Sequence, residues 1–176
     1  MPPVVTDCTR QLSEVEHIAA QFGEQLLITN STVTTAESCT GGGIAQAITA
    51  VPGSSQWFDQ GYVTYSNHAK QQLLGVSQQA LSQGAVSEVV VEAMALGALS
   101  HARADISIAV SGIAGPGGGS VEKPVGTVWI AWAKQPKTVI SRCYHFTGDR
   151  AQVRLKTIVE SLKEALRLID ITKNTV

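Results

Sequence analysis

The sequence predicts an α/β fold in which one mixed sheet carries helices on both faces. Short β-branched and apolar runs alternate with segments whose apolar residues recur at helical spacing, which is typical of this class. Two later strand-like runs follow each other directly and are joined by a short turn, as in an antiparallel hairpin. The 176 residues suit one domain. We expect a flexible tail over residues 1–11 and the folded domain over residues 12–170.

The first half of the chain alternates predicted helices and strands. Ser13, with Glu16 three residues later, forms a capping-box pattern ahead of a helical apolar stripe. Pro52 ends the second helix, Asn67 is the expected cap of the third, and Gly75 closes it. The expected elements are a helix over 13–28, a strand over 32–36, a helix over 44–51, a strand over 58–65, a helix over 68–74 and a turn or short helix over 78–83.

The second half adds a long helix, three strands and a final helix. Ser87 and Glu88 begin the long helix, and Asp149, with Gln152 three residues on, caps the last one. The expected elements are a helix from 87 to about 103, strands over 105–110, 126–134 and 138–146, and a helix from 149 to about 169. The loops after residues 36, 110 and 146 all follow strands, so we expect them to converge on one cleft.

Composition excludes several classes of protein. Hydrophobic residues make up 44% of the chain and charged residues 15%, and the formal net charge is −1. No dense basic block indicates nucleic acid as a partner. The longest apolar run, residues 128–133, is far shorter than the roughly 20 residues that cross a bilayer. The three cysteines show no metal or disulfide spacing, and no signal peptide is evident, so we expect a cytoplasmic protein. The low charge suggests a homo-oligomer, most simply a dimer.

The turn over residues 34–43 is the predicted active site. It links a strand to a helix start, where unpaired N–H groups favour an anion or an oxyanion. Ser38 is the candidate nucleophile, and the N–H groups of Cys39, Thr40 and Gly41 are candidate oxyanion donors. Glu37 and Gly42 complete the turn's candidate substrate-contacting positions. The alternative is that Ser38 and Thr40 only cap the helix, as such residues usually do.

A nucleophilic serine needs a base, and the segment over residues 65–70 is the expected source. A lysine in a partly apolar pocket has a lowered pKa and can accept a proton. Lys70 is therefore the candidate base, and Tyr65 is a candidate relay. The alternative is a surface lysine beside a core tyrosine. None of the four histidines lies in a strand-end motif.

Three further features leave alternatives open. Cys39 is a rival nucleophile, because thiols at helix starts ionise readily. The glycine-rich loop that includes Gly112 and Gly115 can cradle a phosphate with its N–H groups or serve only as a connection. Arg150, at the start of the last helix, can clamp a phosphate or be solvated. No metal-ligand cluster is evident, so no metal is expected.

Six motifs, in order along the chain, resemble the CinA C-terminal domain family. They are residues 35–42 (TAESCTGG), 61–67 (GYVTYSN), 84–88 (GAVSE), 111–116 (SGIAGP), 123–128 (KPVGTV) and 146–150 (FTGDR). The resemblance covers about residues 12–168.

The resemblance implies a three-layer α/β/α sandwich and, for stand-alone members, deamidation of nicotinamide mononucleotide to nicotinate mononucleotide and ammonia without cofactor or metal. It implies Ser38 as nucleophile and Lys70 as base, helped by Tyr65. Two alternatives remain, a Cys39-dependent amidase of other specificity and a catalytically silent nucleotide-binding member.

Overall fold

One five-stranded mixed sheet forms the centre of the molecule. The computed structural model describes residues 7–171, and the side chains of residues 12–169. The strand order is β2-β1-β3-β4-β5. β1 is parallel to β2 and to β3, whereas β3, β4 and β5 pair antiparallel in succession. The strands are β1 (Val33–Glu37), β2 (Phe58–Val63), β3 (Ile106–Gly112), β4 (Thr127–Lys134) and β5 (Thr138–His145).

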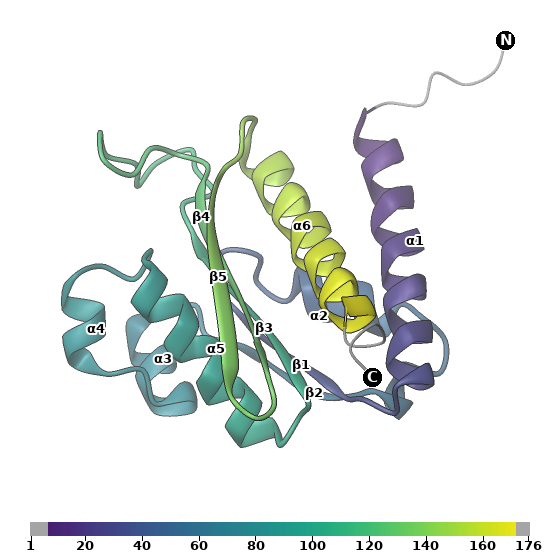
Figure 1. The fold of residues 1–176 in the computed structure, drawn as a ribbon. Helices are drawn as coiled ribbons and strands as arrows, with labels where there is room; N and C mark the ends of the chain where they lie inside the picture. The colour runs from purple at the N-terminus through teal and green to yellow at the C-terminus, as the bar shows by residue number, and fades with distance from the viewer. Residues whose placement is uncertain (1–6, 172–176) are drawn as a thin grey trace, which may run out of the picture.

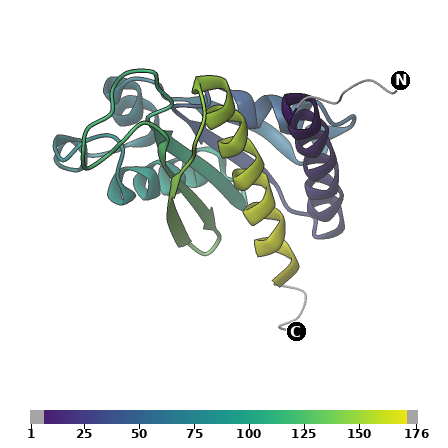
Figure 2. The ribbon, with the colours of Figure 1, turned by 90° about the horizontal axis from the view of Figure 1, so that it is seen from above.

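Helices cover both faces of this sheet, which confirms the predicted fold class. α1, α2 and α6 lie on one face and α3, α4 and α5 on the other (Figure 1). Figure 2 shows α1 and α6 running side by side along their shared face. Each helical layer buries its own apolar cluster against the sheet. The helices are α1 (Asp7–Ile28), α2 (Gly43–Thr49), α3 (Asn67–Leu74), α4 (Gln78–Ser82), α5 (Glu88–Ala102) and α6 (Arg150–Ile171), with a 3₁₀ turn at Ser54–Gln56.

Several expected boundaries differ from those observed. α1 begins at Asp7 rather than at Ser13, so residues 7–11 of the expected tail are helical, and residues 1–6 lie outside the described part of the chain. Ser66, not Asn67, caps α3, because its hydroxyl accepts a hydrogen bond from the N–H of Ala69. The expected reciprocal cap of α6 is confirmed, since Asp149 and Gln152 bond each other's N–H groups.

The strand directions bring the predicted loops together. β1 and β3 run in the same direction, and β5 regains that direction after two antiparallel steps. Their carboxyl ends therefore meet at one edge of the sheet, as expected. The turn after β1, the glycine-rich loop after β3 and the start of α6 after β5 are neighbours there.

Candidate active site

The turn between β1 and α2 places Ser38 at the carboxyl edge of the sheet. The N–H of Ser38 donates to the carbonyl of Val110 in β3 at 3.1 Å, which fixes the residue to the central strands. Gly41 and Gly42 follow with φ angles of 59° and 95°. Side chains other than glycine rarely adopt two such angles in succession, so these two glycines let the backbone turn abruptly into α2. Ser38 remains half-buried at the surface of the turn.

Lys70 lies in α3, on the face of the sheet opposite to α2, and its side chain reaches Ser38. Its Nζ lies 3.1 Å from Ser38 Oγ and donates to the carbonyl of Thr64 at 2.8 Å. The side chain is only 1% exposed. Burial disfavours the charged amine and lowers the pKa of Lys70 from its ordinary value. The pair predicted from the sequence is thus brought together, 32 residues apart in the chain.

The hydroxyl of Tyr65 has a different partner from the one expected. It accepts a hydrogen bond from Arg150 Nη2 at 2.8 Å, and the side chain is 59% exposed. The described side chains give Tyr65 no hydrogen bond with Lys70 or Ser38. This position favours a role at the mouth of the site over the expected proton relay.

Glu37 lies beneath the turn rather than facing solvent. Its side chain is fully buried, at 0% exposed. The carboxylate accepts hydrogen bonds from the Thr40 hydroxyl and from the N–H groups of Gly42, Ile44 and Ala45. Burial and these internal bonds speak against the substrate contact expected from the sequence, and they indicate that Glu37 holds the turn in shape.

The backbone of the turn leaves few N–H groups for an oxyanion. Gly41, one of the expected donors, bonds the carbonyl of Ser38, and Gly42 bonds the carboxylate of Glu37. In the described part of the chain, the N–H groups of Cys39 and Thr40 donate to no other residue. The expected set of oxyanion donors is therefore reduced to these two.

Arg150 connects the loops that converge on the site. Besides Tyr65, its guanidinium bonds the carbonyl of Gly115 at 2.8 Å. Gly115 has a positive φ and lies against Val125, and Gly112 packs against Val128 of β4. The absence of a side chain at both glycines is thus explained by packing, and their expected contact with substrate stays a prediction.

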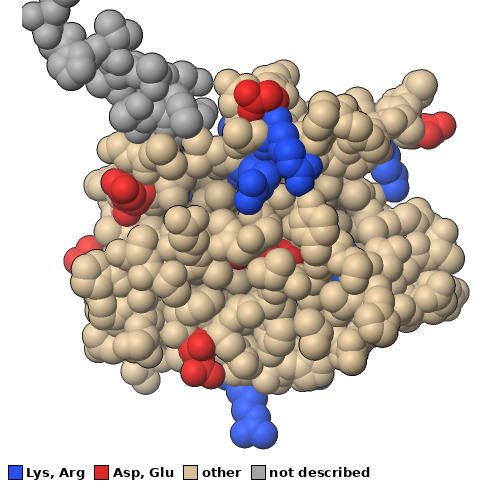
Figure 3. Space-filling model, turned by 180° about the vertical axis from the view of Figure 1, so that it is seen from behind, with Lys and Arg blue, Asp and Glu red and all other residues tan. Residues whose placement is uncertain are grey.

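Arg154 lies in the same region and was not among the residues predicted from the sequence. Its Nη2 donates to the carbonyl of Thr40 at 2.7 Å, so it secures the turn from α6. The signal that could have found it is its spacing of four residues from Arg150, which places both side chains on one face of α6. On the face drawn in Figure 3, several Lys and Arg side chains gather in a patch near the top, others lie apart at the right and at the lower edge, and most of the remaining surface is uncharged.

Cys39 is poorly suited to be the nucleophile. Its side chain is 5% exposed. Burial, with the nearby Glu37 carboxylate, raises the pKa of the Cys39 thiol to about 12. The thiol therefore stays protonated at neutral pH and lacks the reactivity of a thiolate.

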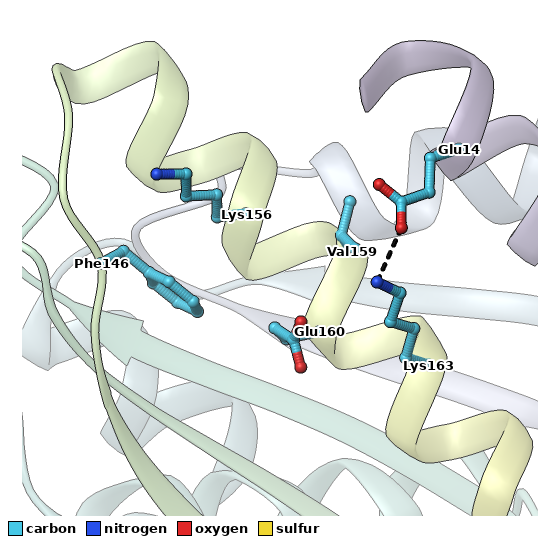
Figure 4. A pocket seen from close by; sticks show the side chains of 6 residues that line it. All are labelled: Glu14, Phe146, Lys156, Val159, Glu160 and Lys163. Carbon is cyan, nitrogen blue, oxygen red and sulfur yellow. Dashed lines mark ion pairs between the residues drawn. The ribbon is translucent and has the colours of Figure 1, made fainter. Parts of the chain in front are cut away.

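The two larger surface cavities beside α6 have volumes of several hundred Å³. One, of about 320 Å³, is lined by Glu14, Phe146, Lys156, Val159, Glu160 and Lys163. Figure 4 shows the ion pair between Lys163 and Glu14 that joins α6 to α1 beside this cavity, at 2.6 Å. The other, of about 390 Å³, lies between α1, α2 and α6 and is lined in part by Gly43, Arg154 and Ile158. Ser38 and Lys70 line neither of them.

Among the described side chains of residues 12–169, no three His, Cys, Asp or Glu residues gather as a metal site would require. No helix within residues 7–171 combines the length and apolar character needed to cross a membrane.

Known proteins share both the sequence and the fold. The profile of the CinA C-terminal domain matches residues 15–169. A nicotinamide-nucleotide amidohydrolase PncC from Enterobacter agglomerans is 55% identical over 154 residues, covering 87% of this chain and 94% of that protein. The PncC of Escherichia coli K12 is 53% identical, covering 86% and 92%.

Solved structures of other proteins share this fold. The competence/damage inducible protein CihA from Agrobacterium tumefaciens superposes with a TM-score of 0.86 at 42% identity, covering 89% of this chain and 96% of that one. A CinA superfamily protein from Klebsiella pneumoniae gives a TM-score of 0.85 at 36% identity, covering 89% and 98%. The chain therefore belongs to the CinA C-terminal domain family.

Proposed function

We propose that this chain is a nicotinamide-nucleotide amidohydrolase, which converts nicotinamide mononucleotide and water to nicotinate mononucleotide and ammonia. The observation that carries the proposal is the approach of the buried Lys70 amine to the Ser38 hydroxyl at 3.1 Å. The names of the similar proteins from Enterobacter agglomerans and Escherichia coli, which this chain matches over most of its length, support the same substrate.

The first half of the reaction forms an acyl-enzyme. A neutral Lys70 amine offers its lone pair to the Ser38 O–H, while the carbonyl of Thr64 holds one of its N–H groups. Ser38 Oγ attacks the carboxamide carbon as its proton passes to Lys70. The N–H groups of Cys39 and Thr40 stabilise the oxyanion of the tetrahedral intermediate. Lys70 then gives its proton to the leaving nitrogen, and ammonia departs.

The second half regenerates the enzyme. Lys70, neutral again, takes a proton from water, which attacks the acyl carbon. Collapse of this second intermediate breaks the bond to Ser38 Oγ and returns the proton to that oxygen. The carboxylic acid formed in this step releases its proton to the solvent, and the product is the carboxylate of nicotinate mononucleotide.

Ser38→Ala tests the nucleophile. Purified wild-type protein should release ammonia from nicotinamide mononucleotide, and the variant should release almost none. Cys39→Ala is the matched control and should retain activity, because the thiol is buried and protonated. Full activity in Ser38→Ala would remove Ser38 from the mechanism. Binding of the nucleotide by the wild type without ammonia release would instead identify a catalytically silent member.

Arg150 is our candidate for binding the 5′-phosphate. Its Nη1 and Nη2 each make one hydrogen bond within the protein, and the side chain is exposed. Its remaining N–H donors suit a phosphate. Arg150→Ala should raise KM for nicotinamide mononucleotide by about 10- to 100-fold, as expected for losing a hydrogen bond to a charged group. KM for nicotinamide riboside, which lacks the phosphate, should stay unchanged. Equal effects on both substrates would exclude this role.

A homodimer and a cytoplasmic location also belong to the proposal. The low content of charged residues supports self-association, and α1 exposes the apolar side chains of Leu12, Leu27 and Ile28. Light scattering coupled to size-exclusion chromatography measures the oligomeric state directly. A monomer at assay concentrations would contradict the dimer.

A further inference from the structure

Glu37 is a buried carboxylate with an unusual set of partners. Among the described side chains of residues 12–169, it forms no ion pair with Lys or Arg. Four donors satisfy it instead, with the Thr40 hydroxyl at 2.6 Å and the N–H groups of Gly42, Ile44 and Ala45 at 2.8 to 3.0 Å. A buried charge is tolerated only with such complete hydrogen bonding. The first turn of α2 thus donates its N–H groups to Glu37.

These bonds connect the two sides of the nucleophile turn. Glu37 is the last residue of β1, and its carbonyl accepts from the N–H of Thr64, whose own carbonyl holds Lys70. Its side chain reaches across the turn to α2. Ser38 lies directly after Glu37, so the same residue fixes the start of the turn through its backbone and the end through its side chain.

We propose that Glu37 is a positioning residue, which holds Ser38 and the free N–H groups of residues 39 and 40 in the geometry that catalysis needs. It acts through the turn and does not touch the substrate. A charged acceptor is required because an amide in its place has only one oxygen, and its NH₂ group would face at least one of the four donors. This inference rests on the proposed amide hydrolysis.

The substitution Glu37→Gln tests this inference when its effects on kcat and on KM are measured separately. Misplacement of reacting groups by about 1 Å lowers turnover by roughly 100-fold. We therefore expect kcat for nicotinamide mononucleotide to fall by about 100-fold in Glu37→Gln, with KM nearly unchanged, at a temperature well below the unfolding transition of each variant. Unchanged kcat, or an effect confined to KM, would overturn the inference, since the first indicates a purely structural carboxylate and the second a substrate contact.

Two controls separate positioning from stability. Glu164→Gln removes another buried carboxylate, held by Arg167 and Arg142 far along α6, and should lower the unfolding temperature without changing kcat. If Glu37→Gln does not fold, Thr40→Val decides. This substitution removes the hydroxyl that donates a hydrogen bond to the Glu37 carboxylate. We expect kcat to fall with KM nearly unchanged, and an unchanged kcat would overturn the inference.

A covalent probe distinguishes this inference from the proposed function. If the wild type releases no ammonia, the amidohydrolase proposal fails. The inference is then tested by the rate of covalent modification of Ser38 by phenylmethylsulfonyl fluoride, which mass spectrometry measures. Slower modification in Glu37→Gln than in the wild type supports positioning. Equal rates, or no modification of Ser38 in either protein, would overturn it.

Discussion

At the scale of single residues, the buried amine of Lys70 governs the expected pH dependence. Catalysis requires the neutral amine, and burial lowers the pKa of Lys70. The value of kcat/KM should therefore be full above this pKa and fall as the pH drops through it. In Lys70→Ala, this fall of kcat/KM at low pH (the acid limb) should disappear. The rate should also decrease by about 10²- to 10⁴-fold, as is typical for removal of a general base. A pH–rate profile of both proteins checks it, and an unchanged limb in the variant would assign it to another group.

Tyr65 offers a second test at this scale. Its hydroxyl bonds Arg150, so Tyr65→Phe should disturb substrate binding rather than proton transfer. We expect KM for nicotinamide mononucleotide to rise about two- to tenfold, the usual range for one hydrogen bond, with kcat and the acid limb retained. Steady-state kinetics across pH measures both effects. A shifted acid limb would restore Tyr65 as a proton relay.

Part of the geometry of the candidate site was predictable from the sequence. The proximity of Ser38 and Lys70 follows from a strand-to-helix turn and a second strand end that carry them, since parallel strands bring such ends together. The orientation of Glu37 was not predictable, because neighbouring strand residues face opposite sides and the side that α2 covers depends on tertiary packing. The partner of Tyr65 likewise depends on where α6 begins, which the local sequence does not specify.

At the scale of elements, the contact between α3 and α5 determines where Lys70 lies. A Cβ atom on Gly97 of α5 would collide with the backbone carbonyl of Leu74, at the end of α3. Alanine gains about 1 kcal/mol of helix propensity over glycine, but overpacking against a backbone that cannot rotate away loses about 1 to 3 kcal/mol. We therefore expect Gly97→Ala to lower both stability and kcat, as measured by urea unfolding and ammonia release.

The control for that substitution is Gly117→Ala. Gly117 lies in an exposed loop, and a Cβ atom there would meet nothing within 4 Å. Its stability should match that of the wild type. An equally stable Gly97→Ala would show that α3 can shift without loss.

The elements were predicted better than their ends. Periodicity and breakers identify the strands and the long helices, because burial of one face imposes the pattern. Ser66 and Asn67 are both good capping residues, and the choice between them depends on the path of the chain after β2. The start of α1 was placed too late, because the capping-box pattern of Ser13 and Glu16 lies inside the helix and not at its beginning.

At the scale of the whole molecule, the ion pairs of α6 predict an acid-sensitive fold. Hydrogen bonding from Arg167, helped by Arg142 of β5, lowers the pKa of Glu164. A carboxyl whose pKa is lower in the folded state stabilises the protein above its unfolded pKa of about 4.3, and this stability is lost as the pH falls through the folded pKa. Glu164→Gln should therefore flatten the acid side of the curve of unfolding free energy against pH. A curve that remains parallel to the wild type would contradict this.

The burial of Lys70 has an evolutionary consequence. Its amine has a lower pKa in the folded chain than in the unfolded one, so at neutral pH a lysine at this position opposes folding. A library of variants sorted only for resistance to heat or protease should discard this lysine early in favour of methionine or leucine. The same library sorted for turnover should keep it. Sequencing both pools would show whether selection for turnover keeps Lys70 where selection for stability removes it.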